Sequence, residues 1–110
     1  ARRVAFEESR ANLRQILTRL RQYQTMIVGP PPVAEDQQNE RIMTLSRAYS
    51  EDTRAMNVPF IDIFSALVSD SSYRRELRDS DGAHPGSVGY AKISQLVLSS
   101  PYWWFHSLPR

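Results

Sequence analysis

Two side chains of complementary chemistry lie close together late in the chain, in the run Asp81-Gly82-Ala83-His84-Pro85. A turn containing Gly82 can bring the Asp81 carboxylate onto one imidazole nitrogen of His84. Such a contact fixes the tautomer of the ring and stabilises the imidazolium. Pro85 favours extended backbone at His84, which would direct the ring out of the loop. The run therefore predicts the acid and base of a general-base site.

The same spacing has simpler interpretations. Asp81 can cap a turn while His84 lies free on the surface. An isolated Asp and His at this spacing more often have these structural roles than a catalytic one. A metal site would need further ligands, and the sequence places no third ligand near these two. Cysteine is absent from the 110 residues, which excludes thiolate ligands and disulfides. We therefore expect no metal and no cofactor.

Composition indicates a globular domain with a modest core. Of the 110 residues, 41% are hydrophobic and 24% are charged, and the formal net charge is +2. The arginines are interspersed with Asp and Glu and form no cationic stripe, so we expect no nucleic-acid partner. No apolar run approaches the about 18 residues that a membrane span requires, so no span is expected.

Hydrophobic periodicity indicates the elements that would position this loop. The helical pattern occurs over residues 4–23, 35–56, 65–68, 73–77 and 87–98. The uninterrupted apolar run 25–29 predicts a strand buried on both faces, and the run 58–63 predicts a second strand. Pro30 stops the first strand, because proline cannot donate a hydrogen bond to a sheet. The stretch 78–86 is a loop by composition.

The same patterns predict where particular side chains lie. The apolar face of the first helix should comprise Leu13, Ile16, Leu17 and Leu20. Asn57 is expected to end the second long helix in a left-handed conformation. Asp62 is expected to face solvent or a loop, without a catalytic role.

Strands that alternate with helices predict an α/β fold with a parallel sheet, in which 35–56 is the crossover. Ligands of open α/β sheets bind beyond the carboxyl ends of the strands, where the loop 78–86 lies. Only two strands are visible, and a two-stranded sheet would leave a long apolar edge unpaired. The chain also opens in a helical pattern without an initiator Met. We therefore expect 1–100 to be the C-terminal part of one domain, completed by an N-terminal segment of the same protein, with 101–110 as an aromatic tail.

A family resemblance adds to this interpretation. The chain reads Asp81-Gly82-Ala83-His84-Pro85 and then Val88-Gly89-Tyr90-Ala91. These runs resemble the last signature block of the GDSL-type (SGNH) serine esterases and lipases, which is D-x-x-H-P followed by a helix start with Gly-Tyr. The resemblance covers residues 4–98. Within it, 6–14 is similar to the helix after the family's Gly-x-Asn-Asp block, 26–33 to its fourth strand and the next loop, and 58–63 to its fifth strand.

The resemblance implies a fold and a reaction. The fold would be the flavodoxin-like three-layer α/β/α arrangement of the SGNH hydrolases, with this chain supplying the last two of five parallel strands. Asp81 and His84 would be the acid and base of a Ser-His-Asp triad that cleaves carboxylic esters or thioesters by acyl transfer. The sequence departs from the family because it lacks the Gly-Asp-Ser nucleophile motif and the blocks with the oxyanion-hole Gly and Asn. We therefore expect this chain alone to be inactive.

Other functional interpretations stay open. A related enzyme would be an acyltransferase that uses the same triad. A different class would be a non-catalytic SGNH-like module that binds an ester or a glycan, or an inactive fragment. The expected partner of the enzyme is a small-molecule ester, and oligomerisation is an option.

Two segments could contribute to a substrate site. An acyl pocket could be lined by Pro31, Pro32, Val33 and Pro85, although a strand stop and a stiff loop explain the prolines equally well. The aromatic run Tyr102-Trp103-Trp104-Phe105 could pack back over a helix, contact another copy, or form one wall of the substrate site. His106 beside it is expected on the surface.

Overall fold

A pair of parallel strands lies at the centre of the fold. The computed structural model describes residues 5–103, and within them β1 (Ile27–Val28) pairs in parallel with β2 (Phe60–Ile61). The register places Ile27 beside Phe60 and Val28 beside Ile61. The long helix α2 (Asp36–Ala55) connects the two strands, and it is the crossover that parallel neighbours require.

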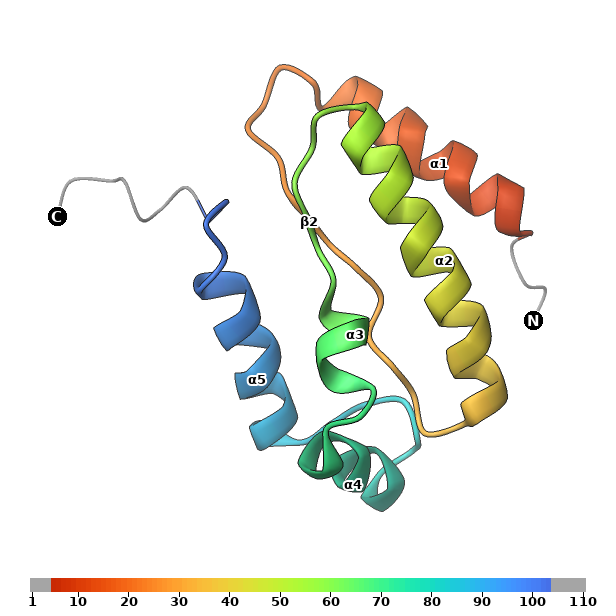
Figure 1. Ribbon diagram of the computed structural model, residues 1–110, viewed down its shortest axis with the longest axis vertical. Coiled ribbons are helices and arrows are strands. Elements are labelled where there is room, and N and C mark those ends of the chain that lie inside the picture. Colours follow the sequence, from red (N-terminus) through yellow and green to blue (C-terminus); the bar gives the residue numbers. More distant parts are fainter. Residues whose placement is uncertain (1–4, 104–110) are drawn as a thin grey trace, which may run out of the picture.

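Helices lie on both sides of the strands (Figure 1). α1 (Phe6–Arg19) packs against α2 on one side of the strand pair, and α5 (Ser87–Leu98) lies on the other side. Two short helices, α3 (Ile63–Leu67) and α4 (Ser71–Asp79), connect β2 to the loop that precedes α5. The order of layers is helix, strand, helix, as predicted for an α/β fold.

The best-packed part of the core lies between α3 and α4. Ile63, Leu67, Tyr73 and Leu77 form a cluster in which each residue is at most 2% exposed. Partly buried side chains from other elements pack against this cluster, namely Ala34, Ile61, Ile93 and Leu96. Two members of the cluster come from α4, so α4 is held firmly beneath the loop that leads to α5.

The predicted second strand, 58–63, is too long. β2 ends at Ile61 because Asp62 caps the next helix, and its carboxylate accepts a hydrogen bond from the Ser65 amide at 3.0 Å. α3 therefore begins at Ile63, earlier than the predicted 65–68. Asp62 itself is exposed, as expected.

Side-chain capping also explains where α4 begins. Asp70 accepts a hydrogen bond from the Tyr73 amide at 2.9 Å, so the helix starts before the predicted segment 73–77. The helix ends at Asp79, beyond the predicted end. The predicted first strand, 25–29, is reduced to the two residues of β1. Among the described residues each strand has a partner on one edge only, and the two strands pair over two residues each.

The bounds of α2 and α5 agree better with those predicted from the sequence. The helices predicted over 35–56 and 87–98 are confirmed as α2 and α5. Asn57 follows α2 with a φ of 58°, the left-handed conformation predicted for it.

The first helix differs from its prediction in length and in burial. It ends at Arg19 rather than at residue 23, and Val4 lies outside the described residues. Of its expected apolar face, Leu17 is buried whereas Ile16 is 52% exposed. α1 packs mainly on α2, so only one narrow stripe of it is covered.

Large apolar side chains on several elements are exposed. They include Phe6, Ile16, Val28, Val88, Tyr90 and Leu98. Within residues 5–103, each of the two strands also has one edge without a partner strand. Unpaired edges and exposed apolar side chains are the features that other polypeptide segments usually cover. In the same part of the chain no helix has the length and apolar character needed to span a membrane.

A carboxylate of low exposure ties α1 to α2. Both oxygens of Asp52 accept hydrogen bonds from the Arg10 guanidinium, at 2.9 and 2.7 Å, and Arg14 contributes a longer one at 3.4 Å. The Asp52 side chain is only 9% exposed. The hydrogen bond from Arg10, helped by the positive charges of both arginines, lowers the pKa of the Asp52 carboxyl below its usual value.

Replacing Asp52 tests this tie. Asp52→Asn should lower the free energy of unfolding at pH 7 by about 1–3 kcal/mol, because the bidentate charged pair with Arg10 is lost. The pKa of Asp52 is lower in the folded state, so its contribution is present above the unfolded value of about 3.9 and is lost as the pH falls through the folded value. Urea unfolding of both proteins at pH 7 and pH 3 should therefore show a difference that shrinks in acid.

Glu51 provides the matched control for this experiment. Its side chain is 75% exposed and lies 3.8 Å from Arg10. Glu51→Gln should change the unfolding free energy by less than about 0.5 kcal/mol at either pH. An equal effect of the two substitutions would contradict the special role of Asp52.

Candidate active site

Asp81 and His84 form the contact that the sequence predicts. The Oδ2 atom of Asp81 lies 2.7 Å from Nδ1 of His84. The other carboxylate oxygen, Oδ1, accepts hydrogen bonds from the backbone amides of Ala83 and His84, each at 2.9 Å. Gly82 makes the turn possible with a φ of 84°, where a side chain would be strained. One carboxylate thus organises both the turn and the imidazole.

The hydrogen bonds to Asp81 determine its charge. The amide of Ala83, and then the His84 ring and amide, hold the pKa of the Asp81 carboxyl far below its usual range. The carboxylate is therefore ionised, and it favours the His84 tautomer that carries its proton on Nδ1. The lone pair is then on Nε2, which makes no hydrogen bond to any residue between 5 and 103. The His84 side chain is 71% exposed, so Nε2 is accessible to a group from outside this chain.

Three hydrogen bonds anchor the turn to the rest of the fold. The Gly82 amide donates to the carbonyl of Leu77 in α4 at 2.9 Å. The Gly82 carbonyl accepts from the amide of Ala34, in the segment after β1, at 2.8 Å. The Ser80 hydroxyl donates to the His84 carbonyl at 2.5 Å. The pair is therefore fixed at the carboxyl end of β1, the edge at which ligands bind in open α/β sheets.

The end of the loop is held by a residue that the sequence analysis missed. Glu76 in α4 accepts hydrogen bonds from the amides of Gly86 and Gly89 through Oε1, at 3.0 and 2.6 Å. Its Oε2 accepts a longer bond from the Val88 amide at 3.3 Å. No local signal marks this residue, because it lies far along the chain from the helix start that it caps. The only signal in the sequence is the pair of glycines, Gly86 and Gly89, which allow another group to approach the backbone closely.

The four residues predicted to line an acyl pocket have different environments. Pro32 is fully buried, Pro31 is exposed, and Val33 and Pro85 are partly buried. The backbone of Val33 is fixed by Asn39, which accepts from its amide and donates to its carbonyl, both at 2.8 Å. This segment contacts the Asp81–His84 loop through Ala34, so it lies at the same edge of the strands as that pair. Its contact with an acyl chain stays a prediction.

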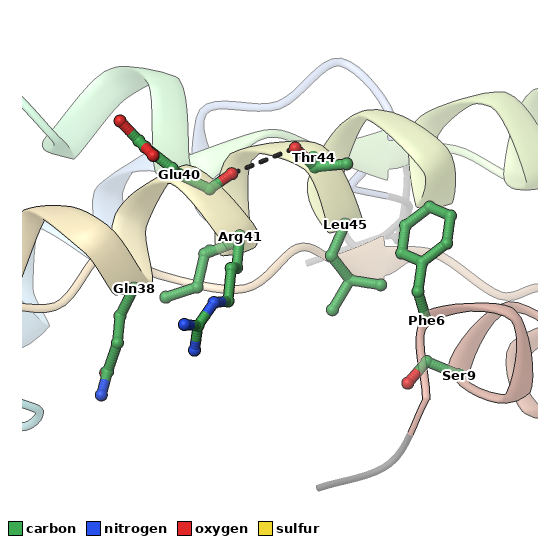
Figure 2. Close-up of a pocket in the computed structure, with 8 residues that line it drawn as sticks. Phe6, Ser9, Gln38, Glu40, Arg41, Thr44 and Leu45 are labelled. Carbon is green, nitrogen blue, oxygen red and sulfur yellow. Dashed lines mark hydrogen bonds between the residues drawn. The ribbon is translucent and has the colours of Figure 1, made fainter.

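A wide groove lies away from the Asp81–His84 pair. It has a volume of about 730 Å³ and lies between the first turn of α1 and the first half of α2. Figure 2 shows Phe6, Arg41 and Leu45 on its walls. Neither Asp81 nor His84 lines it. Within residues 5–103, no group of three His, Asp or Glu side chains could hold a metal ion.

The aromatic tail is described only in its first part. Tyr102 is 57% exposed and lines a hollow together with Val58 and Pro59, at the amino end of β2. This end of the strand is opposite to the one that carries the Asp81–His84 loop (Figure 1). Trp104, Phe105 and His106 lie outside the described residues.

Comparison with known proteins identifies the family of this chain. The family model of the GDSL-like lipase/acylhydrolases matches residues 1–92. The chain belongs to this family. The matched region contains the whole Asp81–His84 turn, so the resemblance seen in the sequence is confirmed. A search of the curated proteins found no match.

A solved structure supports the fold of this family member. The chain is similar to the crystal structure of the lipase/acylhydrolase from Enterococcus faecalis, with a TM-score of 0.73 and 24% sequence identity. The similarity covers 88% of this chain and 51% of that one, so the chain spans about half the length of this structure. The predicted flavodoxin-like α/β fold of the SGNH hydrolases is thereby confirmed for the part that the chain contains.

Asp81→Asn tests the electrostatics of the pair. The asparagine keeps an oxygen for the two backbone amides, but its NH₂ group faces Nδ1 of His84 and can only donate. The imidazole should therefore change from the tautomer with its proton on Nδ1 to the one with its proton on Nε2. The ¹⁵N chemical shifts of the ring above pH 8, measured by NMR, report this change directly.

The exposed Asp79, in the last turn of α4, provides the control. Asp79→Asn removes a similar charge from the same region and should leave the His84 ring spectrum unchanged. An unchanged spectrum in Asp81→Asn would show that Asp81 does not set the tautomer.

Proposed function

We propose that this chain carries the acid and the base of a Ser-His-Asp triad that cleaves carboxylic esters or thioesters by acyl transfer. The observation that carries the proposal is the 2.7 Å contact between Asp81 Oδ2 and His84 Nδ1, with Nε2 left accessible. This arrangement suits a general base, whose ring is oriented on one side and reacts on the other. Membership of the GDSL-like lipase/acylhydrolase family supports the same reaction class.

In the proposed reaction, Nε2 of His84 takes the proton of a serine hydroxyl as its oxygen attacks the substrate carbonyl carbon. The imidazolium that forms is stabilised by the ionised Asp81, which does not take up the proton itself. His84 then gives the proton to the leaving alcohol or thiol as the acyl–oxygen or acyl–sulfur bond breaks. Water attacks the acyl-enzyme with the same base, and the acid is released.

The nucleophile of this reaction has to come from further polypeptide, because the chain contains no Gly-Asp-Ser motif. We infer that an N-terminal segment of the same protein supplies the serine and the oxyanion hole and adds strands beside β1. Three observations support this: the unpaired strand edges, the exposed Val28 beside them, and the greater length of the similar lipase/acylhydrolase. The chain alone should then have no measurable turnover.

Removing the base tests the proposed function. In the complete enzyme, with the serine-bearing segment present, His84→Ala should lower kcat/KM for a short aryl ester at least about a thousandfold, because the serine is no longer activated. The chain contains two histidines, so His106→Ala is the matched control and should leave turnover unchanged. Near-normal hydrolysis by His84→Ala would refute the role assigned to His84.

Labelling with a fluorophosphonate locates the nucleophile independently. The probe reacts with an activated serine, and the intact mass of every polypeptide present shows where the adduct lies. We expect an adduct outside residues 1–110, formed much more slowly in His84→Ala. An adduct on a serine of this chain would contradict the placement of the nucleophile, and no adduct at all would favour a non-catalytic binding module.

A further inference from the structure

Both ends of the active-site loop are attached to neighbouring residues of α4. The Leu77 carbonyl accepts the Gly82 amide at 2.9 Å at the start of the loop. The adjacent Glu76 carboxylate accepts the Gly86 amide at 3.0 Å at its end. His84 lies between these two attachment points. One turn of α4 thus fixes the backbone on both sides of His84.

The second attachment is built around a carboxylate. A methyl group added at Gly86 would lie 2.7 Å from Oε2 of Glu76, and one added at Gly89 would lie 2.8 Å from Oε1. The methyl group added at Gly89 would also lie 2.4 Å from the Cβ atom of Pro85. A larger residue at either glycine would therefore have to displace the Glu76 side chain. The carboxylate at the start of α5 also complements the partial positive charge of the helix end.

The support for Glu76 is itself rigid. Leu77 and Tyr73 of α4 are buried in the core cluster. At the start of the helix, Asp70 accepts the Tyr73 amide and also pairs with Lys92 of α5 at 2.6 Å. α4 and α5 are thus joined at both ends of α4, by Asp70 and by Glu76.

We propose that Glu76 is a positioning residue for His84, acting through the backbone of Pro85 and Gly86. Its hydrogen bonds from the Gly86 and Gly89 amides hold the backbone that follows His84 and Pro85 in place, so that the ring can stay exposed without losing its contact with Asp81. This inference rests on the proposed function for its effect on turnover. Its effect on the imidazole is measurable without turnover.

The first measurement is the ¹⁵N spectrum of the His84 ring in this chain. In Glu76→Ala, the ring should lose part of its preference for the proton on Nδ1, and its signals should broaden, because the Asp81–His84 contact is no longer held. Glu76→Gln keeps the Oε1 acceptor for Gly86 and Gly89 and should retain the wild-type spectrum. A wild-type spectrum in Glu76→Ala would overturn the proposal, as would equal damage by both variants.

A helix cap remote from the loop provides the control for simple loss of stability. Asp62 caps α3 with a bond to the Ser65 amide at 3.0 Å and makes no contact with the loop. Asp62→Ala should destabilise the fold and leave the His84 spectrum unchanged. If Glu76→Ala does not fold, Gly86→Ala displaces the carboxylate from the other side and should alter the same signals.

The second measurement is turnover by the complete enzyme. Glu76→Ala should lower kcat about tenfold to a hundredfold with KM changed less than about twofold, because a displaced base affects the transition state more than substrate binding. Glu76→Gln should restore kcat to within about threefold of the wild type. An altered spectrum with normal turnover would refute the catalytic importance of His84 and leave its positioning by Glu76 intact, so the two failures are distinguishable.

Discussion

A general base, the role proposed for His84, must leave one ring nitrogen open to its reaction partner, so the imidazole has to be oriented from its other nitrogen. In this chain the His84 side chain is 71% exposed, and the hydrogen bond that orients the ring lies at Nδ1, on the side away from Nε2. Asp81 holds the ring, while the backbone on either side is held by Leu77 and Glu76. The geometry of the site therefore depends on α4, whose Tyr73 and Leu77 are buried in the core cluster.

Carboxylates that bind backbone amides recur through the second half of the chain. Asp62 and Asp70 each accept an amide at the start of the helix that follows them, Glu76 accepts amides at the start of α5, and Asp81 accepts two amides within its own turn. Each satisfies donors that a helix start or a tight turn leaves without partners. These helices and turns are short, so charged hydrogen bonds to their first amides add to the stability that α3 and α4 gain from the core cluster. The same groups fix the loop at the carboxyl edge.

Features set by local patterns could be predicted from the sequence, whereas features set by individual side-chain hydrogen bonds or by packing could not. α2 and α5 follow from periodicity because one face of each is repeatedly apolar, and the Asp81–His84 contact follows from a spacing of a few residues. The ends of β2 and α3 were missed because the side chain of Asp62 decides between strand and helix there. Glu76 was missed for a different reason. Its partners become neighbours only after Tyr73 and Leu77 pack α4 against the rest of the core, and no local pattern encodes that distance.

Under the proposed function, the acid and base are assembled before the nucleophile arrives. The Asp81–His84 contact, its anchors on α4 and the bond from Ala34 to Gly82 all lie within this chain. A serine-bearing segment that pairs with the open edge of β1 would meet an imidazole that is already oriented. Little conformational freedom would then be lost at the site itself when the two parts join. The free energy of association would come from covering the exposed apolar side chains and the unpaired strand edge, so the stability of the assembly and the alignment of the base have separate physical origins.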